Sequence, residues 1–191
     1  MPTNIEIASN ALILIGDNPI SAFTEEGVGA TAAANLYDQT YQSVLSEHPW
    51  TFALKEQLLN LLSQTPDDLT NYDKAYQLPV DLIRLWAIFP YSDYTIVGDK
   101  LYSNQSELLA RYTFKQEETL LPAHFVKALE YKLAAEFAQL VTESQTKSEY
   151  FSTLYLQSLA RARNIDSQGK PPTPIISSPF VEPRLSGERF Y

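Results

Sequence analysis

The chain begins with two segments whose apolar residues recur at helical spacing. Thr3 followed by Glu6 matches a capping box, and the apolar positions after it predict a helix over about residues 4–15. A second helix is predicted over about residues 29–48 by apolar residues three and four positions apart. It should end before Pro49, because a residue that precedes proline avoids helical backbone angles.

The second half of the chain predicts two longer helices, over about residues 122–142 and 147–166. In each, apolar side chains three and four positions apart make a continuous stripe along one face. Such a stripe is typical of a core or a subunit interface, and less often of a cofactor site. The candidates for the core or subunit interface are Phe125, Leu129, Leu133, Phe137, Phe151 and Leu154.

Residues 51–115 differ in character, with short runs rich in Tyr, Ile, Val and Leu between turn residues. The segment 97–100 lies between two such runs and predicts a tight hairpin turn. Pro79 and Pro90 are expected at strand ends or edges, because proline cannot donate to a ladder of hydrogen bonds. We predict a small antiparallel sheet of three or four strands. For its first dozen residues, both a strand and a strand turning into a short helix remain open.

The last residues, 170–191, contain five prolines and no regular apolar spacing, so they predict an extended tail that cannot fold on itself. The predicted fold class is therefore α+β, mainly α. A single domain over residues 1–169 would be a helical bundle with a small antiparallel β-sheet insertion, and the extended C-terminal tail would follow it.

Composition and charge narrow the range of functions. With 45% apolar residues in 191, the chain can bury a core without metals or disulfides. No apolar run reaches the length of a membrane span, and the N-terminus lacks the features of a signal peptide, so we expect a soluble protein that is not secreted.

Of the formal charge of −9, residues 1–110 carry −10 and residues 111–191 carry +1. This distribution argues against a protein that grips nucleic acid by its phosphates. It suits a surface past which DNA slides, or an acidic face that only maintains solubility.

Residues that could carry chemistry are few. The chain has no cysteine, which excludes disulfides and thiolate catalysis, and its two histidines, His48 and His124, are far apart in sequence. The segment 27–32, "GVGATA", has the spacing of a dinucleotide fingerprint but does not follow a buried strand. Paired acidic residues lie in predicted loops, where solvation is the default. We therefore predict no catalytic, cofactor-binding or metal-binding residues.

The segment "SEHPWTFAL", residues 46–54, brings a histidine, a proline and two large aromatic residues together at the end of the second predicted helix. A catalytic histidine would need a positioned nucleophile, and the sequence offers none, because Ser46 lies on the far side of the predicted helix end. We interpret the segment as a structural corner where the helical part meets the sheet. Its residues are His48, Pro49, Trp50 and Phe52.

The order of these elements resembles the tail tubular protein A family, the head-to-tail adaptors of short-tailed phages (podoviruses). The resemblance covers most of residues 5–170, and its specificity comes from the number and order of the matching segments. They are "ALILIGDNPISAFTE", "YDQTYQSVLSEHPWTFALK", "YQLPVDLIRLWAI", "ELLARYTF", "FVKALEYKLAAEFAQLVTES" and "ARARNIDSQGKPP". The last residues, "RLSGERFY", depart from the usual ending of the family.

The resemblance implies a structural virion protein without cofactors, assembled in the host cytoplasm and located in the tail and connector region. Twelve copies would form a ring between the portal and the tail nozzle, a tail tubular protein B-like partner. Genome DNA would pass through the ring without specific binding. The helices would build the ring wall, and the tail would dock on the portal through Phe180, Arg184, Phe190 and Tyr191.

Two other hypotheses remain open at this point. One is a small cell-wall hydrolase associated with the tail, because carboxylate chemistry leaves little trace in a sequence. The other is a cytoplasmic oligomeric scaffold unrelated to phages.

Overall fold

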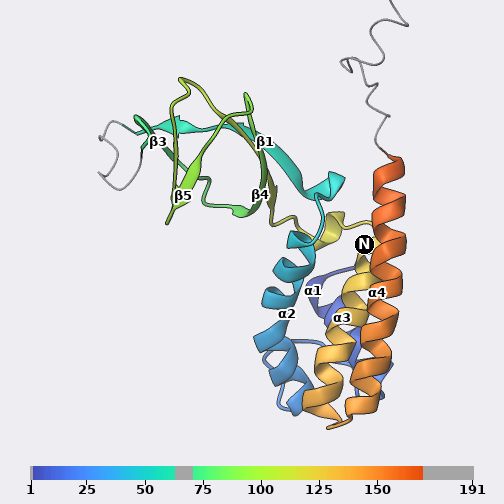
Figure 1. The fold of residues 1–191 in the computed structure, drawn as a ribbon. Helices are drawn as coiled ribbons and strands as arrows, with labels where there is room; N and C mark the ends of the chain where they lie inside the picture. The colour runs from blue at the N-terminus through green and yellow to red at the C-terminus, as the bar shows by residue number, and fades with distance from the viewer. Residues whose placement is uncertain (1, 63–70, 170–191) are drawn as a thin grey trace, which may run out of the picture.

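Four helices pack side by side, and a strand-rich arm projects from one end of the bundle in the computed structural model (Figure 1). The structure describes residues 2–62 and 71–169. The helices are α1 (Asn4–Ile15), α2 (Val28–Ser46), α3 (Ala123–Val141) and α4 (Gln145–Gln168). The predicted α+β, mainly α fold with a helical bundle is confirmed, whereas the predicted tail over 170–191 lies outside the described residues.

Helix ends follow the capping signals in the sequence. The Thr3 hydroxyl accepts a hydrogen bond from the Glu6 N–H, and the Glu6 carboxylate accepts one from the Thr3 N–H, so the predicted capping box is formed. Helix α1 ends before Gly16, whose φ of 87° suits a residue without a side chain. Helix α4 begins two residues earlier than predicted, because the Ser144 hydroxyl accepts from the Lys147 N–H and caps it.

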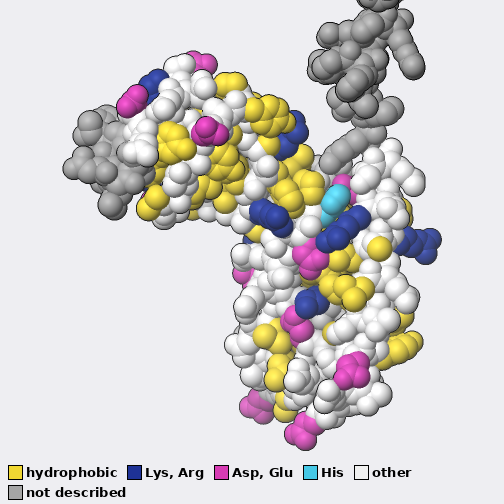
Figure 2. Space-filling model, in the orientation of Figure 1, with side chains coloured by type: hydrophobic (Ala, Val, Ile, Leu, Met, Phe, Trp, Pro, Cys, Tyr) yellow, Lys and Arg dark blue, Asp and Glu magenta, His cyan; other side chains and the backbone are white. Residues whose placement is uncertain are grey.

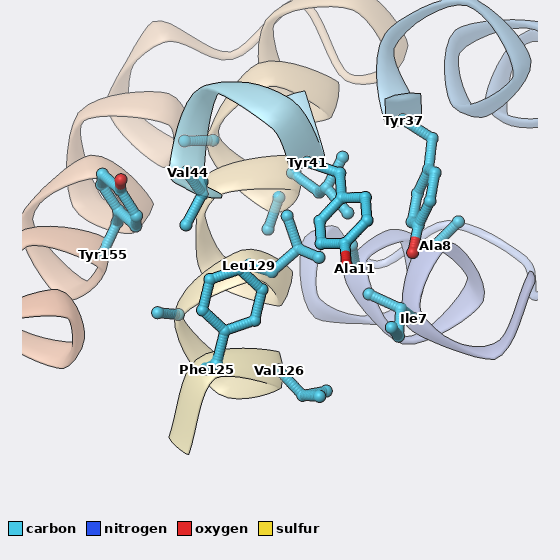
Figure 3. Packing of buried hydrophobic residues seen from close by; sticks show 14 of the residues in the cluster. Ile7, Ala8, Ala11, Tyr37, Tyr41, Val44, Phe125, Val126, Leu129 and Tyr155 are labelled. Carbon is cyan, nitrogen blue, oxygen red and sulfur yellow. The ribbon is translucent and has the colours of Figure 1, made fainter. Parts of the chain in front are cut away.

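Helix α3 lies at the centre of the bundle and contacts the other three helices. Its apolar stripe meets side chains from α1, α2 and α4, and Figure 3 shows Tyr41 of α2 beside Phe125 and Leu129 of α3. The ring centroids of Tyr41 and Phe125 are 6.1 Å apart, with the rings edge to face. This packing forms the main hydrophobic core, and burial of these faces is what holds the bundle together.

The arm contains two antiparallel sheets, so the prediction of one sheet of three or four strands is wrong. In the described residues, one sheet has the strand order β1-β7-β4 and the other β2-β3-β6-β5. The chain passes from the first sheet to the second at Leu59, which lies between β1 and β2. The Leu59 N–H donates to the Leu108 carbonyl. The strands are β1 (Leu54–Leu58), β2 (Asn60–Leu61), β3 (Lys74–Gln77), β4 (Leu82–Phe89), β5 (Thr95–Val97), β6 (Lys100–Ser103) and β7 (Leu109–Phe114).

Turn residues in the arm lie where the sequence places them. Gly98, with φ of 63°, and Asp99 join β5 to β6 as a two-residue hairpin, which confirms the turn predicted over 97–100. Pro79 lies between β3 and β4, and Pro90 directly follows β4, as expected for residues that cannot donate to a ladder.

The arm has a hydrophobic cluster of its own, separate from the core of the bundle. Hydrogen bonds join the two parts: Arg84 Nη1 of the arm donates to the Ser46 carbonyl at 2.7 Å, the Tyr41 hydroxyl donates to the Gln116 carbonyl at 2.7 Å, and Lys115 Nζ donates to Asp38 Oδ1. The molecule is therefore a helical stem with a distinct arm, joined near the end of α2. The arm's buried cluster consists of Leu59, Tyr76, Leu78, Ile88, Leu101, Leu108, Ala110 and Tyr112.

Candidate functional site

The predicted corner lies where the chain leaves α2 and enters the arm. Trp50 is fully buried there, and its indole N–H donates to the Val44 carbonyl at 3.2 Å. Its ring centroid is 4.9 Å from that of His48, 5.8 Å from that of Phe52 and 5.1 Å from that of Phe125. The structure thus brings three of the four predicted corner residues together on the core side of α3, and the fourth, Pro49, lies between two of them in the chain.

A buried carboxylate at the end of α4 holds this corner in place. Asp166 is 5% exposed and accepts from the Thr51 N–H at 3.1 and 3.2 Å and from the Thr51 hydroxyl at 2.5 Å. The Asp166 carboxylate also lies 3.4 Å from His48 Nε2. Hydrogen bonds to both of its oxygens compensate for the burial of this carboxyl group. The chain after Trp50 is therefore fixed to the last turns of α4.

A second carboxylate joins the end of α2 to the middle of α4. The Tyr155 hydroxyl donates to Glu47 Oε1 at 2.5 Å, and Arg163 Nη2 donates to Glu47 Oε2 at 2.9 Å. Burial raises the pKa of the Tyr155 phenol well above its ordinary value, and the hydrogen bond to Glu47 raises it further. Together the two carboxylates make a polar network that covers the edge of the aromatic corner.

The sequence analysis did not predict this network, although the network left one signal in the sequence of α4. Along α4, the buried residues Phe151, Tyr155, Leu159, Ala162 and Asp166 recur four, four, three and four positions apart, so a carboxylate lies in phase with an apolar stripe. A buried carboxylate needs partners, which predicts a polar contact at that end of the helix. The identity of those partners depends on tertiary packing, because Thr51 and Asp166 are 115 residues apart.

The network contains a hydroxyl, a histidine and a carboxylate, but their arrangement differs from that of a hydrolase triad. In such a triad the histidine is bonded to the nucleophile and the carboxylate orients the histidine. Here the Thr51 hydroxyl donates directly to Asp166, which also accepts from the Thr51 N–H. The geometry fixes the chain after α2 and differs from that of a triad, because the carboxylate contacts the hydroxyl directly.

The apolar stripes of α3 and α4 lie in the core of the chain itself. All four candidates on α3 are fully buried. On α4, Phe151 is 7% exposed and Leu154 is partly buried against the same core. Of the two roles left open by the sequence, core and subunit interface, the structure assigns the core. Phe125, Leu129, Leu133 and Phe137 are therefore not accessible to a second copy, whereas Leu154 is partly exposed.

Apolar side chains also reach the surface of the bundle (Figure 2), and two such places lie on α2 and α4. The first is a groove of about 500 Å³ between α2 and the end of α3, where Val28 is 63% and Leu140 53% exposed. The second is on α4 around Leu156, which is 64% exposed; Tyr150, which is 60% exposed, lies six positions away and so about 120° around the helix. We name them the α2 groove and the α4 surface. The α2 groove is lined by Gly27, Val28, Thr31, Ala32, Asn35, Leu36 and Leu140.

Charged pairs on the arm are exposed. Lys55 Nζ lies 3.0 Å from Asp81 Oδ2, and the Tyr112 hydroxyl donates to Asp81 Oδ1 at 2.9 Å. Desolvation opposes ionisation of Asp81, but the hydrogen bonds from Lys55 and Tyr112 outweigh it and lower the pKa of that carboxyl. These exposed pairs contribute little to stability. A shifted pKa in such a pair does not by itself mark a catalytic centre, because structural ion pairs shift pKa values too.

The described residues lack two other kinds of feature, a membrane-spanning helix and a metal cluster. None of the helices in residues 2–62 and 71–169 is both long and apolar enough to cross a membrane. Within the same ranges, no three His, Asp or Glu side chains are grouped so that they could hold a metal ion. The predicted portal-docking residues Phe180, Arg184, Phe190 and Tyr191 lie outside the described residues.

Comparison with known proteins adds no family to this description. No protein-family model matches the chain, and a search of curated proteins finds no match either.

Proposed function

We propose that this chain is a structural virion protein, a head-to-tail adaptor that forms a ring between the portal and the tail nozzle and lines the DNA channel. The proposal starts from the order of sequence segments that resembles the tail tubular protein A family. The separation into a helical stem and an arm supports it, because one part can contact neighbouring copies while the other remains free for a further tail component (Figure 1).

The observation that carries the proposal is the pair of exposed apolar surfaces on the stem. The α2 groove and the α4 surface are on the helices that flank α3 (Figure 1), and they are formed by different residues. If the α4 surface of one copy fills the α2 groove of the next, the contact is head-to-tail, and such contacts close into a ring when the rotation between copies permits it. The number of twelve copies comes from the family resemblance alone.

Single charges placed in each surface test this contact. Val28→Glu introduces a carboxylate into the α2 groove, and Leu156→Glu introduces one on the α4 surface, both at exposed positions where the fold should tolerate them. Val80→Glu, at a fully exposed position of the arm, is the matched control. Light scattering after size-exclusion chromatography and particle imaging, each with and without the portal, should show rings for the wild type and the control and monomers for the two variants.

Mixing the two variants makes the test specific for a head-to-tail contact. The Leu156→Glu copy keeps an intact groove and the Val28→Glu copy keeps an intact α4 surface, so one contact can form and the assembly should stop at a dimer. Variants that still form rings would show that the copies meet elsewhere. A wild-type chain that stays monomeric beside its portal would overturn the adaptor function itself.

Two further parts of the proposal concern the portal and the DNA. Removal of residues 170–191 should abolish portal binding, and binding that survives the truncation would refute the docking role of the tail. The acidic first half of the chain, at −10 over residues 1–110, should repel DNA phosphates, so a gel-shift assay at moderate salt should show no complex. Tight DNA binding would contradict the channel role.

A further inference from the structure

A polar recess lies at one end of the four-stranded sheet of the arm, away from the corner. Lys74 at the start of β3 pairs with Ser103 at the end of β6, so the segments before and after these residues leave the sheet side by side. The segment after β4 completes the wall. The recess has a volume of about 440 Å³, within the range of small-ligand sites. Its described lining residues are Asn71, Tyr72, Tyr91, Ser92, Asp93, Ser103, Asn104 and Gln105.

The chemistry of this lining selects one class of ligand. The described lining residues provide two phenol rings, three carboxamides, two hydroxyls and one carboxylate, and none of them is Lys, Arg or His. An anionic ligand would meet the Asp93 carboxylate, and the Lys74 ammonium beside the recess is outside the lining and donates to the Asn104 carbonyl at 3.4 Å. A purely apolar ligand would bury amide groups without partners, which costs free energy. A neutral ligand with many hydroxyl groups and an apolar face matches both the amides and the rings.

Hydrogen bonds to the sheet hold the backbone around the recess in place. The buried Ser103 hydroxyl donates to the Asp93 carbonyl at 3.1 Å. The Asp73 N–H donates to Asn104 Oδ1 at 2.9 Å, and the Tyr76 hydroxyl donates to the Gln105 carbonyl at 2.6 Å. The segments on both sides are thus positioned before any ligand arrives, which lowers the entropy cost of binding.

The side chains that face the recess, in contrast, are available for a ligand. Among the described residues, the side chains of Asn71, Asp93 and Gln105 have no hydrogen-bond partner. Tyr91 is 79% exposed, and its ring lies edge to face with Phe89, with centroids 4.8 Å apart. This contact holds the Tyr91 ring at the rim, where it offers a flat apolar surface beside the amides and the carboxylate.

We propose that this recess binds a neutral saccharide. The Tyr91 ring packs against the C–H face of a sugar, while the Asp93 carboxylate and the amides of Asn71 and Gln105 bond to its hydroxyl groups. One carboxylate lines the described part of the recess, whereas the usual glycosidase chemistry needs two on either side of the bond, so the proposal concerns binding alone. The site is independent of the ring contacts proposed for the stem.

Titration of the full chain with soluble trisaccharides tests this site. Amide NMR spectra are recorded with maltotriose, cellotriose and the trimer of N-acetylglucosamine, up to about 10 mM to detect millimolar affinity. Sialyllactose serves as the acidic comparison. At least one neutral trisaccharide should shift the signals of residues 71–72, 91–93 and 103–105, and sialyllactose should bind more weakly.

Point variants connect the binding to the recess. Tyr91→Ala and Asp93→Ala should each weaken it by about tenfold or more, which corresponds to about 1.4 kcal/mol. Tyr94→Ala removes a tyrosine that is 40% exposed, lies in the same segment and does not line the recess, so its affinity should match that of the wild type. All three positions are exposed, and circular dichroism checks that each variant folds.

Three results would overturn the proposal. The first is the absence of binding by all three neutral trisaccharides at the highest concentration. The second is binding that is unchanged in folded Tyr91→Ala and Asp93→Ala, because the sugar would then bind elsewhere. The third is a preference for sialyllactose, which would contradict the argument from charge.

Discussion

Replacement of Trp50 by alanine is the most direct test of the corner, because its cost can be worked out from the contacts of one residue. The side chain is 0% exposed and packs edge to face against Phe125. Truncation of a buried Trp or Phe to Ala removes about 3–5 kcal/mol of unfolding free energy. The variant also removes the indole donor of the Val44 carbonyl, but this carbonyl still accepts from the Glu47 N–H, so that loss adds little. We expect a total loss of about 4 kcal/mol.

A loss of this size is easily measured. A typical domain has about 5–15 kcal/mol of unfolding free energy in total, so the variant should lose a large fraction of it. Urea unfolding followed by circular dichroism is the suitable assay. Tryptophan fluorescence is less suitable, because in the variant it would come only from the second tryptophan, Trp86. The urea midpoint should fall while the slope stays the same, since the surface exposed on unfolding changes little. For a chain of this size the melting temperature should fall by roughly 8–16 °C.

Two control variants show whether the cost comes from the packing of Trp50 or would follow from the removal of any aromatic side chain. Trp50→Phe keeps a ring against Phe125 but loses the N–H donor and some volume, so it should cost about 1–2 kcal/mol. Tyr91→Ala, at a position that is 79% exposed, should stay within about 0.5 kcal/mol of the wild type. A loss below about 1 kcal/mol for Trp50→Ala would refute the assignment of Trp50 as the packed centre of the corner. Equal losses for the alanine and phenylalanine variants would place the cost in the hydrogen bond and not in packing.

Three further predictions concern the polar groups around the corner. His48→Ala should cost only about 1 kcal/mol in the same urea assay, because the His48 side chain is already 18% exposed. Asp166→Ala should cost about 2–3 kcal/mol, since it removes the acceptor of both the Thr51 N–H and hydroxyl, and Asp166→Asn should recover part of the loss. The raised pKa of the Tyr155 phenol means that the folded chain keeps a proton that the unfolded chain releases above the ordinary pKa of 10.0. Stability should therefore be complete below pH 10 and fall as the pH rises further, and absorbance titration should show phenolate from Tyr155 only as the chain unfolds.

The helices could be predicted from the sequence because their signals are local. A capping box spans residues 3–6, and an apolar stripe needs only spacing within one segment. The end of α2 differs by two residues from the prediction, at Ser46 and not at His48, because the restriction before Pro49 acts on a turn that has already left the helix. Differences of this size are normal at helix ends, where local signals compete.

The division of the arm into two sheets could not be predicted, because it depends on pairing between distant residues. Leu54 of β1 pairs with Thr113 of β7, whereas Asn60 of β2 pairs with Gln77 of β3. The change of sheet takes place at Leu59, in an apolar run that could equally form a helix when considered alone. The carboxylate network could not be predicted for the same reason, because each acceptor and its donors lie far apart in the sequence. The recess in the arm is likewise made from three loops whose separate compositions indicate only turns.

The corner has a further consequence for the proposed adaptor, because the stem and the arm each have a separate hydrophobic core. The direction of the arm depends on the contacts at the junction: the packing of Trp50 and of Ile83 from β4 within the core of the stem, the bond from Thr51 to Asp166 and the bond from Arg84 to the Ser46 carbonyl. In a ring, every copy must present its arm at the same angle for a second ring to dock. A change that loosens the junction while both cores stay folded should therefore impair docking of the nozzle more than formation of the ring. The corner would then be required by the geometry of the assembly, in addition to its contribution to the stability of one copy.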